Sequence, residues 1–222
     1  LAHPDPLASD APDQRTPLRL AYLGAALAGK RGAAWDATIE ARRQGLSIEG
    51  VYRELLIWTQ RRIGELWASA QITVAAEHMA SSVTQSVMGR LYADIPGDRP
   101  AGHALIAGAE GELHALPAHL ASDLLEIDGW NVAFVGTNVP EASLLAALTT
   151  EKPDVLGLSV TMAFNLPRTV ALVQAVRSRF ATLPVVIGGR AVLGAVSLGG
   201  ELGVDVDSAG DFAAFQGYRR GG

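Results

Sequence analysis

The sequence contains no cysteine, which excludes disulfide bonds, thiolate metal ligands and cysteine nucleophiles and fits a reducing compartment. Long apolar runs are missing as well. The longest stretch without a charged residue extends from Val155 to Pro167 and is too short to span a bilayer. The first residues lack the basic and then apolar layout of a secretory signal. Together these absences predict a cytoplasmic protein that does not cross a membrane.

Basic residues are not gathered into a patch, and 18 lysines and arginines stand against 23 acidic residues, for a net charge of −5. Direct binding to nucleic acid is therefore not indicated. The sequence shows no glycine-rich phosphate loop, no pair of catalytic carboxylates and no hydrolase triad, so it does not indicate an enzyme. A hydrophobic fraction of 49% over 222 residues is enough for a substantial core, in one large domain or two small ones.

The first part of the chain divides into a tail and a helical region. Residues 1–16 contain three prolines and three aspartates, which predicts a flexible tail. Over residues 17–94 the apolar side chains recur with helical spacing, and short links favour an antiparallel four-helix bundle. The expected helices are residues 18–27, residues 33–44, one from an N-cap at Ser47 to about Trp67, and one from an N-cap at Thr73 to about Tyr92. The expected buried side of the third helix is Val51, Leu55, Trp58, Ile63 and Leu66.

The second part of the chain, residues 102–218, has a different pattern after an expected linker at residues 95–101. Short apolar runs alternate with helical stretches, which indicates βαβ units and a parallel sheet. Ligands of such sheets bind outside the carboxyl ends of the strands. The expected strands are residues 103–107, 131–135, 154–159, 184–188 and 203–206.

A histidine with a neighbouring carboxylate follows the first expected strand. His114 stands two residues after Glu112, where a metal ligand would lie at the carboxyl edge of the sheet. A carboxylate in this position can hold the tautomer of the imidazole ring and raise its basicity. Upstream, nine residues separate Trp67 from a second carboxylate–histidine pair, Glu77 and His78. That pair and the tryptophan fall on separate helices of the expected bundle.

Several short motifs, in order along most of the chain, resemble those of cobalamin-dependent photoreceptors of the CarH type. The motifs similar to those of the cobalamin-binding fold are Gly111–His114, Gly129–Trp130, Val139–Pro140, Ser159–Thr161 and Gly188–Gly189. The motifs similar to those of the helical cap of these photoreceptors are Ile63–Trp67 and Ile72–His78. The resemblance implies a four-helix bundle cap followed by a flavodoxin-like, parallel five-stranded α/β domain. The helix-turn-helix DNA-binding domain that usually precedes the cap in this family has no counterpart in residues 1–16.

The resemblance also implies a role for each motif. His114 would be the lower axial ligand of cobalt, with Glu112 behind it. The tunnel for the nucleotide tail of cobalamin would be lined by Ser159 and Thr161, and Gly188 and Gly189 would let the backbone approach the flat ligand closely. Val139 and Pro140 would also bind the cofactor. The upper axial group, commonly adenosyl, would be surrounded by Trp67, Glu77 and His78. The chain departs from the family where Glu112 replaces the usual aspartate and Pro117 stands near the end of the motif. It also has Ala68 where some photoreceptors carry a histidine that captures cobalt after photolysis.

The implied function is light sensing: photolysis of adenosylcobalamin changes the position of the cap or the assembly of the protein. Such a sensor would act as a homo-oligomer or through a protein partner. Two alternatives stay open. One is a corrinoid carrier protein of a methyltransferase system, although a lid of Trp67, Glu77 and His78 over cobalt disfavours it. The other is a related sensor that binds haem, or a bilin that is held noncovalently because cysteine is absent.

Overall fold

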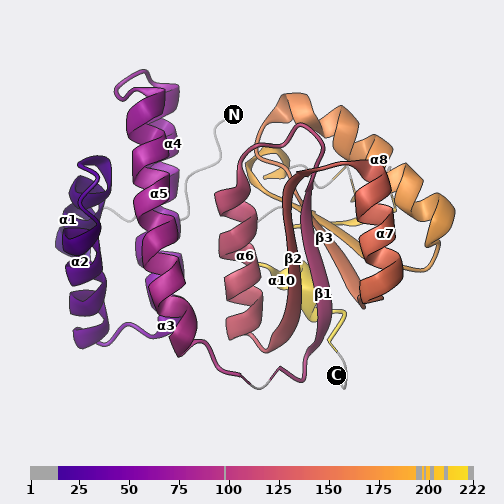
Figure 1. The fold of residues 1–222 in the computed structure, drawn as a ribbon, viewed down its shortest axis with the longest axis horizontal. Helices are drawn as coiled ribbons and strands as arrows, with labels where there is room; N and C mark the ends of the chain where they lie inside the picture. The colour runs from indigo at the N-terminus through magenta and orange to yellow at the C-terminus, as the bar shows by residue number, and fades with distance from the viewer. Residues whose placement is uncertain are drawn as a thin grey trace. The chain divides into compact units, whose positions relative to one another are not determined.

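The computed structural model describes residues 15–97, 99–193, 197, 199–200, 203–207 and 210–219 (Figure 1). The chain divides into two compact units, one up to Asp94 and one from Ile95 onward. Residues 1–14 of the expected tail lie outside the described residues, and the first helix already begins at Thr16. Within the described part of the chain, no helix is long and apolar enough to cross a membrane.

The first unit is helical and follows the expected order. Its elements are α1 (Thr16–Leu27), α2 (Arg31–Arg43), α3 (Ile48–Gly50), η1 (Val51–Ile57), α4 (Trp58–Ala68), α5 (Val74–Leu91) and η2 (Tyr92–Asp94). Both expected N-caps are confirmed. The Ser47 hydroxyl accepts the N–H of Gly50 at 3.0 Å, and the Thr73 hydroxyl accepts that of Ala76 at 3.2 Å.

The third helix contains a π-helical segment, η1, between α3 and α4. Wide turns of this kind add a residue to the helix and change which side chains lie on its buried face. The buried side chains of η1 and α4 are Val51, Tyr52, Leu55, Leu56, Thr59 and Ile63. The expectation that Trp58 lies on this face was wrong, because the wide turns bring the neighbouring Thr59 inward. Trp58 is only half-buried, and the guanidinium of Arg19 lies 5.3 Å from the centre of its ring.

The second unit is a parallel sheet with helices on both faces. Its described strands are β1 (Gly102–Ala109), β2 (Trp130–Val139), β3 (Val155–Ser159), β4 (Val185–Gly188) and β5 (Asp205–Val206). Their order is β2-β1-β3-β4-β5 and all pairings are parallel, which is the flavodoxin-like arrangement and confirms the expected fold. The helical elements are α6 (Ala115–Ile127), α7 (Glu141–Glu151), η3 (Ala163–Asn165), α8 (Leu166–Arg179), η4 (Arg190–Val192) and α10 (Ala213–Gln216).

Alternate side chains of β1 pack into two different clusters, one on each face of the sheet. Leu105, Ala107 and Ala109 join buried residues of α7 and α8. Ala104 and Ile106 join those of α6 and α10, including Phe215. Because β1 is buried on both faces, its carboxyl end is held firmly, and the loop that follows it starts from a fixed position.

Candidate functional site

Glu112 and His114 form a close pair in the loop between β1 and α6. A tight turn leads into this loop: the N–H of Glu112 donates to Ala109 O at 2.9 Å, and Gly111 adopts a φ of +91°, which a glycine reaches without strain. The Glu112 side chain is buried, whereas the His114 side chain is 43% exposed. Glu112 Oε1 lies 2.7 Å from His114 Nδ1 and also accepts the backbone N–H of His114 at 2.9 Å.

The second oxygen of Glu112 is also fully engaged. Oε2 accepts the backbone N–H of Thr161 at 2.9 Å and the side-chain amide of Asn165 at 3.0 Å. Burial alone would raise the pKa of Glu112, but the hydrogen bonds from His114, Thr161 and Asn165 lower that pKa from 4.5 to about 2. The carboxylate is therefore ionised at neutral pH, and it fixes the orientation of the His114 ring.

Two asparagines that the sequence reasoning missed complete the loop's support. Asn165 is buried and stands two residues before Pro167 at the start of α8. A polar residue just before a proline that begins a helix was the sequence signal that could have identified it. Asn138 accepts the N–H of Gly111 on its side-chain oxygen at 2.9 Å. It has a φ of +56° in the irregular end of β2, which extends well beyond the expected residues 131–135.

Ser159, Thr161, Gly188 and Gly189 meet at the carboxyl ends of β3 and β4. Ser159 is paired with Gly188 in the sheet. Gly189 has a φ of +106°, and a Cβ at this position would lie 2.4 Å from Val160 O, so only glycine fits. The hydroxyl of Thr161 is buried and has no hydrogen-bond partner among the described residues. The Gly189 backbone therefore packs directly against that of Val160, next to the buried Thr161 hydroxyl.

Asp207 is another residue that the sequence reasoning missed, and it lies beside Gly188. It follows β5 and is 5% exposed, and its Oδ1 accepts the N–H of Phe212 at 3.2 Å. Burial raises the pKa of Asp207 above its usual range, although neighbouring backbone N–H groups oppose the shift. Val139 and Pro140 end β2 at the same edge of the sheet, where Val139 pairs with Ala109 and is buried.

In the helical unit, Trp67 lies near the end of α4, and Glu77 lies in the first turn of α5 with His78 next to it. A short link joins α4 to α5 (Figure 1), so these residues lie near the same end of the two helices. Glu77 Oε2 is 3.4 Å from His78 Nε2. The exposed fraction is 40% for Trp67 and 75% for the His78 side chain, but only 25% for the Glu77 side chain.

Comparison with known families identifies two regions of the chain. A model described as "B12 binding domain" matches residues 102–212, and a second model with the same description matches residues 18–92. The chain belongs to the B12-binding domain family. The two matches lie in the two units, one in each. The Glu112–His114 pair lies within the match to residues 102–212.

Relatives of this B12-binding protein include two repressors of Myxococcus xanthus. The HTH-type transcriptional repressor CarA is 31% identical over 120 residues, which are 54% of this chain and 41% of that protein. The HTH-type transcriptional repressor CarH is 29% identical over 130 residues, or 58% of this chain and 43% of that protein. The chain therefore spans about two fifths of each repressor's length. The monomethylamine corrinoid protein of Methanosarcina barkeri shares the fold, with a TM-score of 0.75 and 17% identity over 86% of this chain and 92% of that one.

The residues of this B12-binding protein fit cobalamin on two observations. One imidazole, oriented by a buried carboxylate, stands at the edge of the sheet where ligands of this fold bind. In addition, the buried hydroxyl of Thr161 has no hydrogen-bond partner among the described residues. Among the described residues no three histidine or acidic side chains gather into a metal site.

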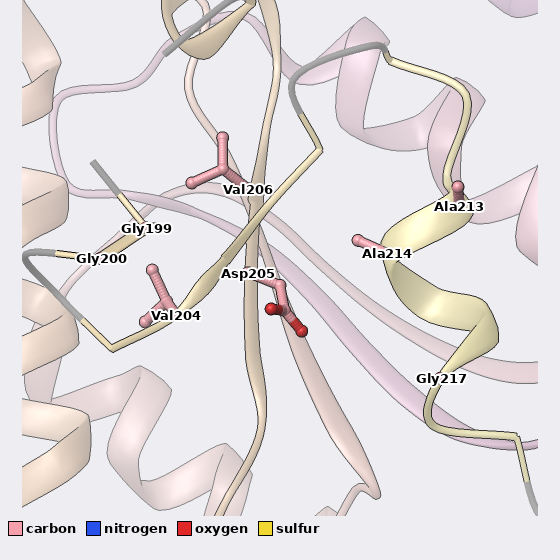
Figure 2. A pocket seen from close by; sticks show the side chains of 8 residues that line it. All are labelled: Gly199, Gly200, Val204, Asp205, Val206, Ala213, Ala214 and Gly217. Carbon is pink, nitrogen blue, oxygen red and sulfur yellow. The ribbon is translucent and has the colours of Figure 1, made fainter. Parts of the chain in front are cut away.

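The α/β unit of this B12-binding protein also has an open hollow of about 510 Å³, shown in Figure 2. Its lining is mostly glycine, alanine and valine, with Asp205 as the charged member: Gly199, Gly200, Val204, Asp205, Val206, Ala213, Ala214 and Gly217. None of these residues was expected to bind the cofactor. The hollow flanks β5 and α10, whereas the candidate site is defined by the ends of β1, β3 and β4.

Proposed function

We propose that this protein is a light-sensing, cobalamin-binding regulator in which loss of an upper adenosyl group changes the position of the helical unit or the assembly of the protein. The observation that carries the proposal is the presence of two carboxylate–histidine pairs. Glu112 and His114 are joined at 2.7 Å in the α/β unit, and Glu77 and His78 lie at the same end of the bundle as Trp67. The likeness to two transcriptional repressors supports a regulatory role.

His114 is the proposed lower axial ligand of cobalt. Glu112 contacts Nδ1, so Nε2 is the ring nitrogen that would ligate the metal. A corrin ring supplies four equatorial nitrogens, and one imidazole from the protein is then enough. The ionised Glu112 favours a proton on Nδ1 and thereby keeps the lone pair on Nε2.

The nucleotide tail of cobalamin is proposed to run along the ends of the strands. Gly188 and Gly189 would lie beside it at the end of β4, and the Thr161 hydroxyl, which has no partner among the described residues, would form a hydrogen bond with it. The remaining residues proposed to line this path are Val139, Pro140 and Ser159. Because Asn165 and Thr161 both hold Glu112, the groove and the lower ligand are parts of one hydrogen-bonded unit.

On the upper side, Trp67 is proposed to pack against the adenosyl group, with Glu77 and His78 forming hydrogen bonds to it. When bound, the cofactor supplies a cobalt–carbon bond that light can break. The protein's part is to make contacts that exist only while the adenosyl group is present. A ligand shifts a conformational equilibrium only through such differential contacts. Exposed side chains such as those of Trp67 and His78 are suited to this role because their present surroundings leave them accessible.

An absorption spectrum tests the proposal. Protein loaded with adenosylcobalamin in the dark should change its spectrum after green light, and its scattering profile should change with it. A spectral change without any change in size or shape would favour a corrinoid carrier. That second candidate is kept because the helical and flavodoxin-like units occur together in the M. barkeri corrinoid protein, a likeness of fold alone. A carrier should also accept a methyl group from a donor enzyme, which a sensor should not.

A further inference from the structure

A chain of polar side chains runs through the helical unit and ends at Glu77. The buried Tyr22 hydroxyl donates to Thr84 Oγ1 at 3.3 Å, and the side-chain amide of Gln60 donates to the same oxygen at 2.8 Å. Ser81 Oγ lies 3.3 Å from Gln60 Oε1 and donates to Glu77 Oε1 at 2.8 Å. These hydrogen-bonded side chains join α1, α4 and α5. Packing of the apolar core alone would not require polar residues at these positions.

The direction of each hydrogen bond follows from the donors available. Burial raises the pKa of Tyr22 to about 12, so its hydroxyl stays protonated and donates to Thr84. Gln60 points its amide N–H toward Thr84 and therefore turns its carbonyl toward Ser81. Ser81 has a single proton and two acceptors in reach. That proton is shared between Gln60 Oε1 at 3.3 Å and Glu77 Oε1 at 2.8 Å, and the shorter contact, to the carboxylate, is the stronger one.

This arrangement distinguishes the two oxygens of Glu77. Oε1 is held by Ser81, and Oε2 lies on the side of His78, at 3.4 Å from Nε2. Glu77 is also in the first turn of α5, where the helix dipole favours a carboxylate. A glutamate with a fixed rotamer has already lost the freedom that a mobile one would lose on binding.

We propose that Ser81, oriented by Gln60, is a positioning residue that presents Glu77 Oε2 to a hydrogen-bond donor of the upper axial group. This inference rests on the proposed function. It specifies the chemistry of that group: a ligand with hydroxyl donors, such as the ribose of adenosyl, is selected over a methyl group. Ser81 does not touch the ligand and acts only through Glu77.

The test measures the affinities of adenosylcobalamin and methylcobalamin in the dark for the wild type and for the variants Ser81→Ala, Ser81→Thr and Glu77→Gln. Ser81→Ala should weaken adenosylcobalamin binding by about 3- to 10-fold and leave methylcobalamin binding unchanged. Ser81→Thr keeps the hydroxyl and should restore the preference. Ser86→Ala is the matched control, since Ser86 is half-buried on the same helix and its hydroxyl donates to Ser82 O. Combined with Glu77→Gln, Ser81→Ala should have no further effect, because its action passes through Glu77.

The outcomes separate this inference from the proposed function. If Glu77→Gln lowers adenosylcobalamin affinity while Ser81→Ala does not, the positioning role is wrong and the upper contact stands. If Glu77→Gln itself leaves both affinities unchanged, the proposed upper contact fails. Equal weakening of both cobalamins by Ser81→Ala would show a purely structural role and overturn the inference. Gln60→Met provides a second variant if Ser81→Ala does not fold, with the same selective loss expected.

Discussion

Glu112 accepts two hydrogen bonds from His114 on a single oxygen, one from ring Nδ1 at 2.7 Å and one from the backbone N–H at 2.9 Å. The residue that would bind cobalt is thus fixed both at its ring and at its backbone by a buried carboxylate. Four groups in all surround that carboxylate, because Thr161 and Asn165 occupy its other oxygen.

His114→Ala should weaken cobalamin binding and change the cobalt-centred absorption spectrum, because no other imidazole is placed to ligate from the β1–α6 loop. Equilibrium binding and spectra at full occupancy measure both effects. His103→Ala, at the opposite end of β1, is the control and should bind as the wild type does. An unchanged spectrum in fully loaded His114→Ala would refute the ligand assignment.

Glu112→Gln should flatten the acid limb of the stability curve of the protein without cofactor. Hydrogen bonds lower the folded-state pKa of Glu112 from 4.5 to about 2 despite its burial, so its contribution is present above pH 4.5 and is lost as the pH falls toward 2. At 1.36 kcal/mol per pKa unit, this contribution is about 3 kcal/mol. Urea denaturation at several pH values checks it. Glu110→Gln, at a neighbouring exposed carboxylate, should give a curve parallel to that of the wild type.

Asn165→Ala should destabilise the α/β unit by roughly 1.5–3 kcal/mol, since it removes a hydrogen bond to a buried charge. The same variant should bind cobalamin less tightly because Glu112 loses part of its support. Denaturant unfolding and titration with cobalamin measure the two effects separately. Asn131→Ala, at the exposed start of β2, should change neither quantity, and equal behaviour of the two variants would argue against the role given to Asn165.

Trp67→Phe should change the preference between adenosylcobalamin and methylcobalamin without unfolding the protein. The side chain is 40% exposed, so its replacement should shift the free energy of unfolding by less than about 1 kcal/mol. The relevant measurement is the ratio of the two dissociation constants beside a thermal unfolding curve. Identical ratios for wild type and variant would count against contact between Trp67 and the upper group.

Light should alter the sedimentation or scattering profile of the adenosylcobalamin form, and methylcobalamin should give a smaller response. A full shift from 1:99 to 99:1 needs about 5.5 kcal/mol of differential affinity, of which a buried adenosyl group with bonds to Glu77 and His78 would supply part. Photolysis is verified by absorbance in the same sample. Superimposable dark and light profiles after complete photolysis would leave a carrier or a passive binder as the better description.

The parallel sheet was predictable because its strands are short apolar runs that alternate with helical periodicity, and the N-caps because Ser47 and Thr73 stand just before such periodicity. The pairing of Glu112 with His114 followed from their spacing of two residues. Asn165, Asn138 and Asp207 were not predictable in the same way. Their contacts join residues 53, 27 and 5 positions apart, and only the folded chain brings them together.

The π-helical segment also explains why the prediction for Trp58 was wrong. The buried face of Val51–Ala68 was predicted from apolar spacing with 3.6 residues per turn, and a π-helical segment does not follow that period. Each residue of an α-helix turns the chain by about 100°. The wide turns of η1 accommodate an extra residue, so deleting one residue within Val51–Ile57 should restore regular winding while Gln60 and Trp67 keep their direction relative to Ile48. A deletion within the regular turns of α4 has no such compensation and should turn Trp67 by about that angle. We therefore expect this helix to tolerate a loss of one residue in η1 and not in α4.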